Sequence, residues 1–305
     1  LNDCNDEYEI KEYKRSIPLE VEHKNFRYED IQDGDAIVVF SKKRVLEIAK
    51  EYSDKGIKTS VIYGDLPPEV RKMQYEQFVK KETKVLVTTD AIGMGVNLPI
   101  RRIIFMSIKK FDGEEIRELT SQEIKQVAGR AGRIGIYDVG YVASVSGNAE
   151  IIKSKLERED KRIEAAVIGP SEAILQIKSL PLNEKLALWS TREEKLDYYT
   201  KMDISEYILR EEIQWDLLKV PFDVTRDDLM ETFLNYVDEL FVNKQKELFK
   251  PECYSGYLDE LEIYYQKINM YYSFSKIFNL KFDIDWVYNE RIKVSEEINE
   301  ILVRI

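Results

Sequence analysis

The chain has 305 residues, of which 44% are hydrophobic and 34% are charged, and its formal net charge is −11. This composition is typical of a folded chain of about two domains, and it excludes disordered, fibrous and uniformly basic nucleic-acid-binding proteins. Two cysteines, Cys4 and Cys253, and one histidine, His23, are too few for a disulfide framework or a zinc site, and no apolar run is long enough to span a membrane.

The N-terminal part is polar and is expected to enter the fold as a connector. Tyr8–Arg15 alternates like a strand that Pro18 ends, and residues 16–34 form a charged connection. The chain begins without a methionine and without a basic and then apolar leader. We therefore expect no signal peptide and a start within a longer polypeptide.

Short apolar strands alternate with helices through residues 35–146. Strands are expected at Asp35–Phe40, Ser60–Tyr63, Lys84–Thr89, Arg102–Ile108 and Gly140–Ser146. Helices are expected to begin at Ser41, at Pro68 and, with Ser121 as the N-cap, ahead of Gln126. This alternation predicts an α/β fold, in which helices flank a parallel sheet and ligands bind beyond the carboxyl ends of the strands.

After residues 169–170 the strand pattern stops and only helical spacing remains. Helices are expected to begin near Ser171, Asn183, Asp203, Thr225 and Asp283, and another to contain Leu261 and Tyr272. We divide the chain into a connector (1–34), an α/β domain (35–168) and an all-α C-terminal domain (169–305). The aromatic residues of 264–278 and the tryptophans are more typical of a core than of a surface that stacks bases.

The segment Gln126–Arg133, with the sequence QVAGRAGR, contains two arginines, Arg130 and Arg133, three residues apart. Residues at i and i+3 share one side of a helical turn, so both guanidiniums are expected to face one target. A polyphosphate suits them, because a guanidinium stays charged and presents a planar fork of donors. The alternative is a surface helix whose arginines are merely solvated.

Polar residues and glycines follow three of the expected strands. Thr89 and Asp90 end one strand, and Gly93 and Gly95 follow in the same loop, where the backbone could approach a phosphate closely. Ser41 and Gly64 offer amides at helix starts after two other strands. Any phosphate-binding surface must be local and is favoured in the first half. Residues 1–150 carry 24 basic against 26 acidic side chains, whereas the rest carries 22 against 31.

Four segments in order resemble helicase motifs. VVFSKK, YGDLPPEVR, VLVTTDAIGMGVNLP and QVAGRAGR resemble motifs IV, IVa, V and VI of superfamily-two helicases, at the spacing of the second RecA-like domain. TTDAIGMGVNLPIRRIIF, together with YKRSIPLEV, resembles the mitochondrial-degradosome type of DExH RNA helicase and its bacterial relatives. The resemblance covers about residues 8–140 and implies a RecA-like fold there. It continues weakly through AAVIGPSEAILQ, and the helical domain after about Leu180 matches by position only.

The resemblance implies roles for ten residues. Arg130 and Arg133 would be arginine fingers on the γ-phosphate of ATP, and Gln126 would help place the attacking water or bridge the phosphate end. Asp90 would contact the ribose or orient an arginine, and Gly93 and Gly95 would lie beside the nucleotide. Ser41, Gly64 and Thr89 would hold the nucleic-acid backbone. Arg71 resembles an arginine that follows motif IVa, although a plain surface charge explains it equally well.

Parts of an ATPase are missing from this sequence. No glycine is followed by lysine, so there is no phosphate-binding loop of the Gly-Lys-Ser/Thr type, and no DExH box follows an apolar strand. We expect these parts, and the ligands of the Mg²⁺ that accompanies ATP, in a first RecA-like domain upstream of Leu1. The chain itself is expected to hold no metal and to hydrolyse no ATP alone.

The expected function is that of the C-terminal portion of an ATP-dependent RNA helicase with 3′ to 5′ direction. Its partners would be single-stranded RNA or an RNA duplex with an overhang, and a ribonuclease could dock on the acidic helical domain. We expect a cytoplasmic location, or a mitochondrial one if a leader precedes the chain. Two alternatives stay open: a non-catalytic RecA-like module that binds RNA or protein, and a DNA helicase, because backbone contacts distinguish RNA from DNA poorly.

Overall fold

The computed structural model describes residues 9, 11, 15–93, 97–159, 171–188, 199–202, 204, 207–253 and 255–305. The chain forms two compact units. Unit 1 contains residues 1–64 and 71–160 together with Ile305, and unit 2 contains residues 65–70 and 161–304. The predicted boundary at residues 168 and 169 falls outside the described residues.

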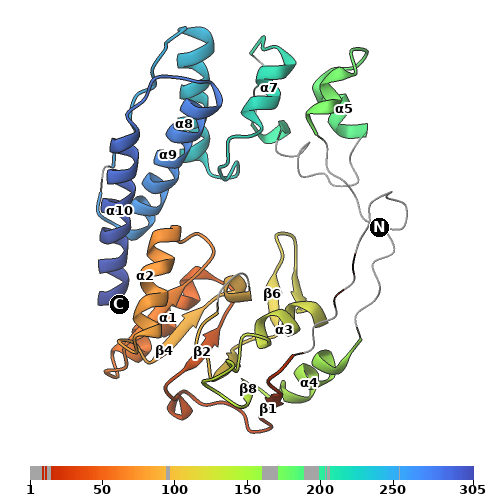
Figure 1. Ribbon diagram of the computed structural model, residues 1–305, viewed down its shortest axis with the longest axis vertical. Coiled ribbons are helices and arrows are strands. Elements are labelled where there is room, and N and C mark those ends of the chain that lie inside the picture. The colour runs from red at the N-terminus through yellow and green to blue at the C-terminus, as the bar shows by residue number, and fades with distance from the viewer. Residues whose placement is uncertain are drawn as a thin grey trace. The chain divides into compact units, whose positions relative to one another are not determined.

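Unit 1 is built on a six-stranded parallel sheet in the order β1, β8, β5, β2, β4, β3 (Figure 1). Its strands are β1 (Leu19–Val21), β2 (Asp35–Val38), β3 (Thr59–Ile62), β4 (Val85–Thr88), β5 (Arg102–Phe105) and β8 (Gly140–Ser144). Val38 pairs with both Thr88 and Phe105, so the carboxyl ends of these strands meet at one edge. The predicted α/β fold with a parallel sheet is confirmed.

Helices cover both faces of this sheet (Figure 1), because its strands are apolar on both sides. The flanking helices are α1 (Lys42–Ser53), α2 (Pro68–Val79), which belongs to unit 1 from Arg71 onward, α3 (Ser121–Ala128) and α4 (Ala149–Glu157). Val38 shares one core cluster with Phe78 of α2, Ile124 of α3 and Ile152 of α4. On the opposite face, α1 packs against β3 and β4 with a stripe that contains the buried Ile48.

The strand predicted at Tyr8–Arg15 lies largely outside the described residues, and the strand that does form is β1, within the expected connector. It pairs in parallel with β8, Leu19 opposite Gly140 and Val21 opposite Val142. We interpreted Pro18 as the end of a strand, whereas it precedes one, a position that suits proline because it has no N–H to donate.

A two-stranded antiparallel hairpin, β6 (Lys109–Phe111) and β7 (Ile116–Glu118), was not predicted. Its turn is stabilised by the Asp112 carboxylate, which accepts the backbone N–H of Glu114 at 3.1 Å and that of Glu115 at 3.0 Å. The strand expected from Arg102 to Ile108 is shorter than predicted: β5 ends at Phe105, and the hairpin begins at Lys109.

Helix α3 begins one residue differently from the prediction. Thr120, not Ser121, is the N-cap: its hydroxyl accepts the N–H of Glu123 at 3.2 Å, and the Glu123 carboxylate accepts the N–H of Thr120 at 2.7 Å. This reciprocal pair satisfies two backbone donors at once, which a cap at Ser121 would not. The Ser121 hydroxyl instead donates to the carbonyl of Lys155 at 2.5 Å.

Unit 2 is helical in its described residues. It contains a 3-10 helix, η3 (Glu172–Gln176), a π-helix, η4 (Asp238–Val242), and the helices α5 (Leu182–Leu188), α7 (Glu211–Leu217), α8 (Asp227–Val237), α9 (Leu258–Ile277) and α10 (Ile284–Arg304). Helix α9 packs against both α8 and α10. The capping residues expected at Asp203 and Glu206 lie outside the described residues, as does Trp189.

Aromatic side chains form the centre of the α8–α9 packing. Tyr236 and Phe274 meet edge to face with ring centroids 5.3 Å apart, and Phe233 lies 5.3 Å from Phe274. Tyr264, Tyr265 and Tyr271 are also buried, whereas Tyr272 and Phe278 are partly buried. The core interpretation of this aromatic segment is therefore confirmed for its buried members. Among the helices that the structure describes, none has both the length and the hydrophobicity of a membrane span.

Candidate functional site

The loop that follows β4 contacts the segment that follows α3. The carbonyl of Gly93 accepts hydrogen bonds from Nε2 of Gln126 at 3.2 Å and from Nη2 of Arg130. Nη1 of Arg133 donates to the carbonyl of Asn97 at 3.0 Å. Predicted site residues from two distant stretches thus meet at one end of the sheet. Gly95, the other glycine predicted there, lies outside the described residues.

The two arginines do not lie on one side of a helix, and that prediction was wrong. Helix α3 ends at Ala128, with Gly129 as its C-cap, and Gly132 takes a left-handed conformation with φ of 76°. Arg130 and Arg133 therefore sit in the turn beyond the helix. Their side chains still reach the same loop, because the backbone of the turn directs both of them toward it. Helical spacing is not the cause.

Gly93 approaches the Gln126 side chain closely at this contact. A Cβ built on Gly93 would lie 3.1 Å from Cγ of Gln126 and 3.3 Å from its Nε2. A larger residue would require the Gln126 side chain to shift by a few tenths of an ångström. The glycine predicted to let a phosphate approach thus also lets the α3 segment approach the loop.

Lys110 of the β6–β7 hairpin links Asp90 to helix α3. Its Nζ lies 3.1 Å from Oδ2 of Asp90 and 2.7 Å from Oε1 of Glu123. Burial lowers the pKa of Lys110, but its hydrogen bonds to Glu123 and Asp90 outweigh burial and raise it overall. Sequence analysis missed Lys110 because nothing in the sequence places the hairpin beside both elements.

Arg117 completes this network from the second strand of the hairpin. Its Nη1 and Nη2 donate to the two Glu123 oxygens at 2.9 and 3.0 Å, a bidentate pair. The Arg117 hydrogen bond is the largest cause that holds the pKa of Glu123 well below its usual range. One carboxylate therefore caps α3 and binds both strands of the hairpin.

Ser41, Gly64 and Thr89 lie beyond the carboxyl ends of the neighbouring strands β2, β3 and β4, so the structure brings these predicted residues to one edge. The Ser41 hydroxyl accepts the N–H of Arg44 at 3.2 Å as the N-cap of α1. The buried Thr89 hydroxyl accepts the N–H of Ala91 at 3.3 Å, and the Gly64 carbonyl accepts from Nη2 of Arg71 at 2.9 Å.

Arg71 lies close enough to Arg130 for both to act on one phenol. Burial raises the pKa of Tyr75, and the positive charges of Arg71 and Arg130 oppose that rise. Arg71 and Arg130 thus lie within electrostatic range of the same phenol, and a role for Arg71 at the site stays a prediction.

A cavity of about 410 Å³ opens at the same edge of the sheet. It is lined by residues that follow β2 and β5 and by residues of α1 and the hairpin: Val39, Phe40, Ser41, Arg44, Met106, Ser107, Lys109, Lys110, Phe111 and Ile116. Phe111 and Ile116 pair across the hairpin and are 62% and 72% exposed, so they offer apolar contact beside cationic groups. Val39, Phe40 and Ser41 belong to the segment VVFSKK that resembles motif IV, whereas the residues from Met106 onward and Arg44 were not predicted, although KKF shows a local mixture of positive charge and an aromatic ring.

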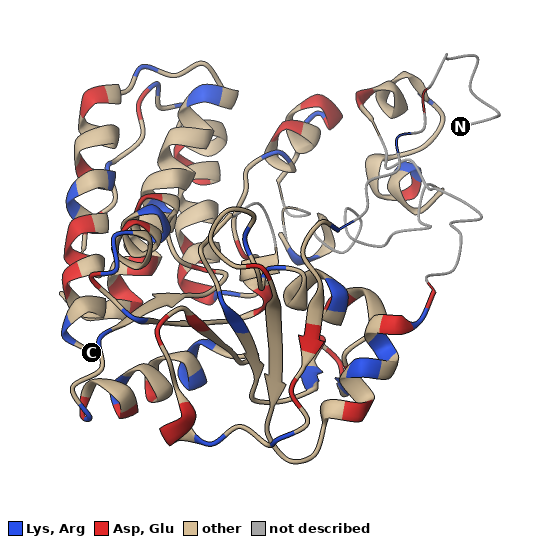
Figure 2. Cartoon of the chain, turned by 60° about the horizontal axis from the view of Figure 1, so that its bottom comes forward, with Lys and Arg blue, Asp and Glu red and all other residues tan. Residues whose placement is uncertain are grey.

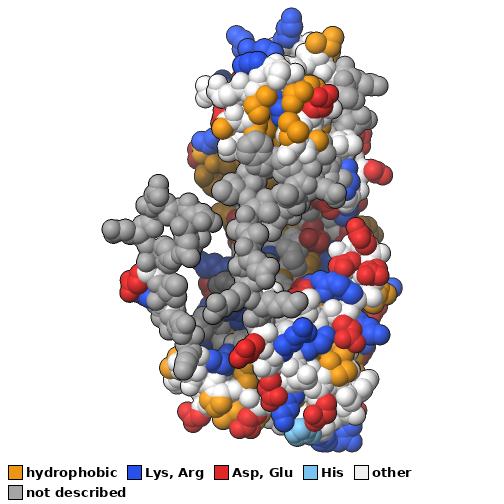
Figure 3. All heavy atoms as spheres, turned by 90° about the vertical axis from the view of Figure 1, so that its right-hand side faces the viewer, with side chains coloured by type: hydrophobic (Ala, Val, Ile, Leu, Met, Phe, Trp, Pro, Cys, Tyr) orange, Lys and Arg blue, Asp and Glu red, His pale blue; other side chains and the backbone are white. Residues whose placement is uncertain are grey.

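Lysines and arginines are interspersed with aspartates and glutamates, both along the chain in Figure 2 and on the face shown in Figure 3. Figure 2 shows acidic positions recurring along the long helix that ends at the C-terminus, α10. On the face in Figure 3, lysine and arginine side chains lie among aspartates and glutamates, without a uniformly basic area among the described residues. Nor do the described residues include a group of three His, Cys, Asp or Glu side chains placed to hold a metal ion.

Two family models match the chain. The Helicase conserved C-terminal domain matches residues 21–135, and the ATP-dependent RNA helicase SUV3 C-terminal domain matches residues 258–304. The second match falls on α9 and α10, the part of the chain for which the motifs carried no resemblance.

Curated relatives match part of their own length. The chain is 35% identical over 211 residues to the ATP-dependent RNA helicase SUV3, mitochondrial, of Candida albicans, and 37% identical over 176 residues to the ATP-dependent RNA helicase SUPV3L1, mitochondrial, of Homo sapiens. These matches cover 68% and 54% of this chain but 29% and 22% of the relatives. The chain thus spans less than a third of the length of these relatives.

Among solved structures, the C-terminal domain of the DEAD-box protein Dbp5 matches 46% of this chain and 82% of its own length. The sequence identity is 20% and the TM-score is 0.35. A similarity of this size carries no inference about function.

Proposed function

We propose a function for this chain from the family to which it belongs. The chain belongs to the superfamily-two RNA helicases of the SUV3 type and carries their C-terminal helicase domain. We propose that it forms one side of an ATP site and holds the backbone of an RNA strand. The resemblance found in the motifs is confirmed at the level of the family. The observation that carries the proposal is the shared Gly93 carbonyl, which joins Gln126 and Arg130 to the loop after Asp90.

The arginines act on the phosphates of ATP in this proposal. In the structure they donate to backbone carbonyls of the Gly93–Asn97 loop, and hydrogen bonds to neutral carbonyls are weaker than those to phosphate. A nucleotide beside this loop would therefore draw Arg130 and Arg133 onto its phosphate oxygens. Gln126 would orient the attacking water, and Asp90 would contact the ribose.

The donor groups at this site suit ATP. Guanidiniums, an amide and backbone groups suit the charge of the transferring phosphate. The phosphate-binding loop and the Mg²⁺ ligands would come from a first RecA-like domain, so the 305-residue chain alone should not hydrolyse ATP.

RNA would lie along the edge formed by Ser41, Gly64 and Thr89, with Arg71 as a further phosphate contact. Backbone groups at strand ends grip phosphates independently of sequence, and binding of this kind weakens with salt. The curated relatives are named RNA helicases, which supports RNA over DNA for this chain. A 3′ to 5′ direction and a ribonuclease partner on the helical unit remain proposals without support from these contacts.

The location proposed for this chain is mitochondrial. The curated relatives are named mitochondrial, which gives no support to the cytoplasmic location expected from the sequence and favours the alternative that depends on a leader. Fluorescence microscopy of the protein expressed from its own complete gene, with a mitochondrial marker, tests this. A uniform cytoplasmic signal would contradict it.

The test of the ATP site uses the complete helicase that contains this chain. Arg130→Ala and Arg133→Ala should each lower kcat for RNA-stimulated ATP hydrolysis by about 10³-fold or more, because an arginine finger acts on charge in the transition state. Arg130→Lys keeps the charge but not the fork and should recover only part of the rate. Arg226→Ala, which removes an exposed arginine of unit 2, is the control. An unchanged kcat in both alanine variants would refute the proposed site.

A further inference from the structure

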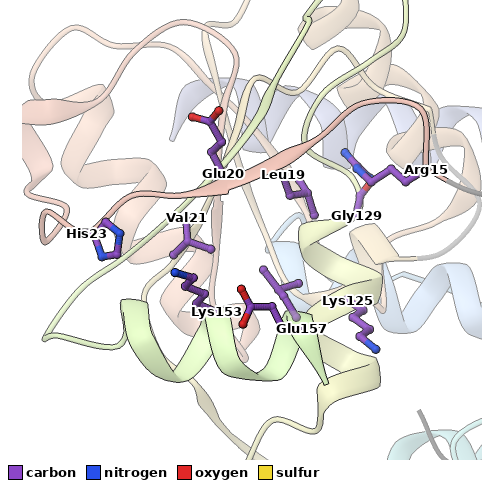
Figure 4. Close-up of a pocket in the computed structure, with 10 residues that line it drawn as sticks. Arg15, Leu19, Glu20, Val21, His23, Lys125, Gly129, Lys153 and Glu157 are labelled. Atoms are coloured by element: carbon purple, nitrogen blue, oxygen red, sulfur yellow. The ribbon is translucent and has the colours of Figure 1, made fainter. Parts of the chain in front are cut away.

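Arg15 holds the backbone of the arginine-bearing turn from behind. Its Nη1 donates to the carbonyl of Gly129 at 2.6 Å, and its Nη2 donates to the carbonyl of Ala131. Its Nε donates to the carbonyl of Ile17 at 2.6 Å, which fixes the plane of the guanidinium. Figure 4 shows Arg15 directed at Gly129 where the N-terminal segment passes the end of α3. This contact joins residues 114 positions apart in the sequence.

The turn is thus held from two directions. The carbonyls of Gly129 and Ala131 accept from Arg15, whereas the side chains of Arg130 and Arg133 reach the loop of Gly93 and Asn97. Ala131 is fully buried, so this turn is part of the folded body and not a loose surface loop. The carbonyls that Arg15 binds belong to residues 129 and 131, directly before and after Arg130. A shift of this backbone would therefore move the guanidiniums of both Arg130 and Arg133.

The residues next to Arg15 pack on the same turn. A Cβ built on Gly132 would lie 2.8 Å from Cγ2 of Ile17 and 2.9 Å from the backbone nitrogen of Gly140. The carbonyl of Pro18 accepts the N–H of Gly140 at 2.9 Å. The stretch YKRSIPLEV, to which the proposed function gives no role, therefore includes a support for the turn that bears the two arginines.

A cavity of about 750 Å³ lies beside this support. Arg15 and Gly129 line it together with Lys125 and side chains of β1 and α4, including Glu20, Lys153 and Glu157 (Figure 4). Because the cavity adjoins the end of α3, apolar side chains do not pack tightly against the turn on the cavity side. The hydrogen bonds of Arg15 hold the backbone of the turn there instead. A guanidinium near the C-terminal end of a helix is also electrostatically favourable.

We propose that Arg15 is a positioning residue for ATP hydrolysis: through the carbonyls of Gly129 and Ala131 it sets the backbone from which Arg130 and Arg133 reach the nucleotide. The inference rests on the proposed function. It requires arginine at this position, because a planar fork binds two separate carbonyls at once, whereas a lysine ammonium is a single compact donor group.

The kinetic test is made in the complete helicase. Arg15→Ala should lower kcat for ATP hydrolysis roughly 10- to 100-fold, since misplacement of a group by about 1 Å has effects of this size. The KM for ATP and the dissociation constant for RNA should stay within about twofold, because Arg15 touches neither ligand. Arg15→Lys should recover part of kcat. Arg27→Ala, which removes an exposed arginine that binds Asp30, is the matched control and should leave kcat unchanged.

A structural readout in the 305-residue chain tests the geometry without activity. In Arg15→Ala, hydrogen exchange should become faster in peptides that cover residues 126–134, where the N–H of Gly132 donates to the carbonyl of Ile100 at 2.8 Å. Peptides that cover β2 should exchange as in the unchanged chain. Equal exchange over 126–134 would show that Arg15 does not constrain the turn, and it would overturn the inference.

The outcomes separate the two proposals. If Arg130→Ala lowers kcat and Arg15→Ala does not, the inference is overturned and the ATP site stands. If Arg130→Ala and Arg133→Ala both leave kcat unchanged, the proposed site fails and the inference fails with it. If Arg15→Ala does not fold, the folded Arg15→Lys protein carries the test, and an unchanged kcat in that variant overturns the inference.

Discussion

The two ends of the unit 1 sheet use arginine in opposite ways. At the amino ends of the strands, Arg102 is 5% exposed and binds Oδ2 of the fully buried Asp35 at 2.6 Å and Oε2 of Glu22 at 2.9 Å. At the carboxyl ends, Arg130 and Arg133 donate to backbone carbonyls of a loop. The first arrangement satisfies charge within the fold, whereas the second holds guanidiniums through bonds that a phosphate can replace. Whether an arginine contacts a charged carboxylate or a neutral carbonyl therefore says more about its role than the residue type does.

The largest expected effect breaks the amino-end network. Asp35→Ala leaves the guanidinium of Arg102 without its most buried carboxylate and should lower the free energy of unfolding of unit 1 by about 3–5 kcal/mol. Urea denaturation followed by circular dichroism measures this. Asp33→Ala, which removes the exposed partner of Lys84, should change stability by less than about 1 kcal/mol. A small effect of Asp35→Ala would mean that the two ends differ less than their contacts suggest.

A smaller effect is expected at the turn that bears the arginines. Gly132→Ala adds a Cβ 2.8 Å from Ile17 at φ of 76°, whereas Gly135→Ala adds one in open space at φ of 81°. Both variants carry the strain of the left-handed region, so their difference isolates the packing of the N-terminal segment on the turn. Gly132→Ala should be less stable than Gly135→Ala by about 1–3 kcal/mol in thermal unfolding. Equal stabilities would contradict the tight packing described for this turn.

The Glu123 carboxylate, which caps α3, should contribute less to the free energy of unfolding, and its contribution should depend on pH. Arg117 lowers the pKa of Glu123 in the folded state, so the contribution is present above the unfolded pKa of a glutamate and is lost as pH falls through the lower folded value. Glu123→Gln should reduce stability by about 1 kcal/mol at pH 7, and this difference should shrink as the pH falls below about 4. Chemical denaturation between pH 7 and pH 3 tests this, with the exposed Glu115→Gln as the control. A difference that is independent of pH would contradict it.

The smallest effect concerns Arg71 at the carboxyl-end edge. Arg71→Ala should weaken binding of single-stranded RNA by a few-fold, and the slope of log affinity against log salt should fall by about 0.7, as expected for one phosphate contact. Fluorescence anisotropy at several salt concentrations measures both quantities. Lys72→Ala, at the exposed neighbouring position on α2, should change the slope less. Equal slopes for all three proteins would remove Arg71 from the RNA surface.

Local pattern was enough to predict the elements that are buried on both faces. The strands β2, β4 and β5 are continuous apolar runs, and the Pro68 helix start is where the sequence placed it. Strand ends then located Ser41, Gly64 and Thr89, because parallel topology alone brings carboxyl ends to one edge. These parts of the candidate site needed no knowledge of distant contacts.

The local sequence pattern could not predict the contacts between residues that lie far apart in the sequence. Strand β1 alternates Leu19 and Val21 with glutamates, so it has too little apolar length to be distinguished from a charged connector. The hairpin is short and polar, and its link from Asp90 to Glu123 depends on where the chain brings Lys110. Arg15 lies in the stretch YKRSIPLEV that carries part of the resemblance, but its contacts could not be predicted, because its partners are backbone carbonyls that any sequence would possess.

The pairing of β1 with β8 also sets an order of assembly during synthesis. Leu19 lies opposite Gly140, so this outer strand waits until about 120 further residues have left the ribosome, roughly 6–24 s at 5–20 residues per second. The four central and far-edge strands are already complete by then. The hydrogen bonds of Arg15 to the turn that bears Arg130 and Arg133 are consequently among the last contacts of this sheet to form, and residues 15–21 must stay available throughout that interval.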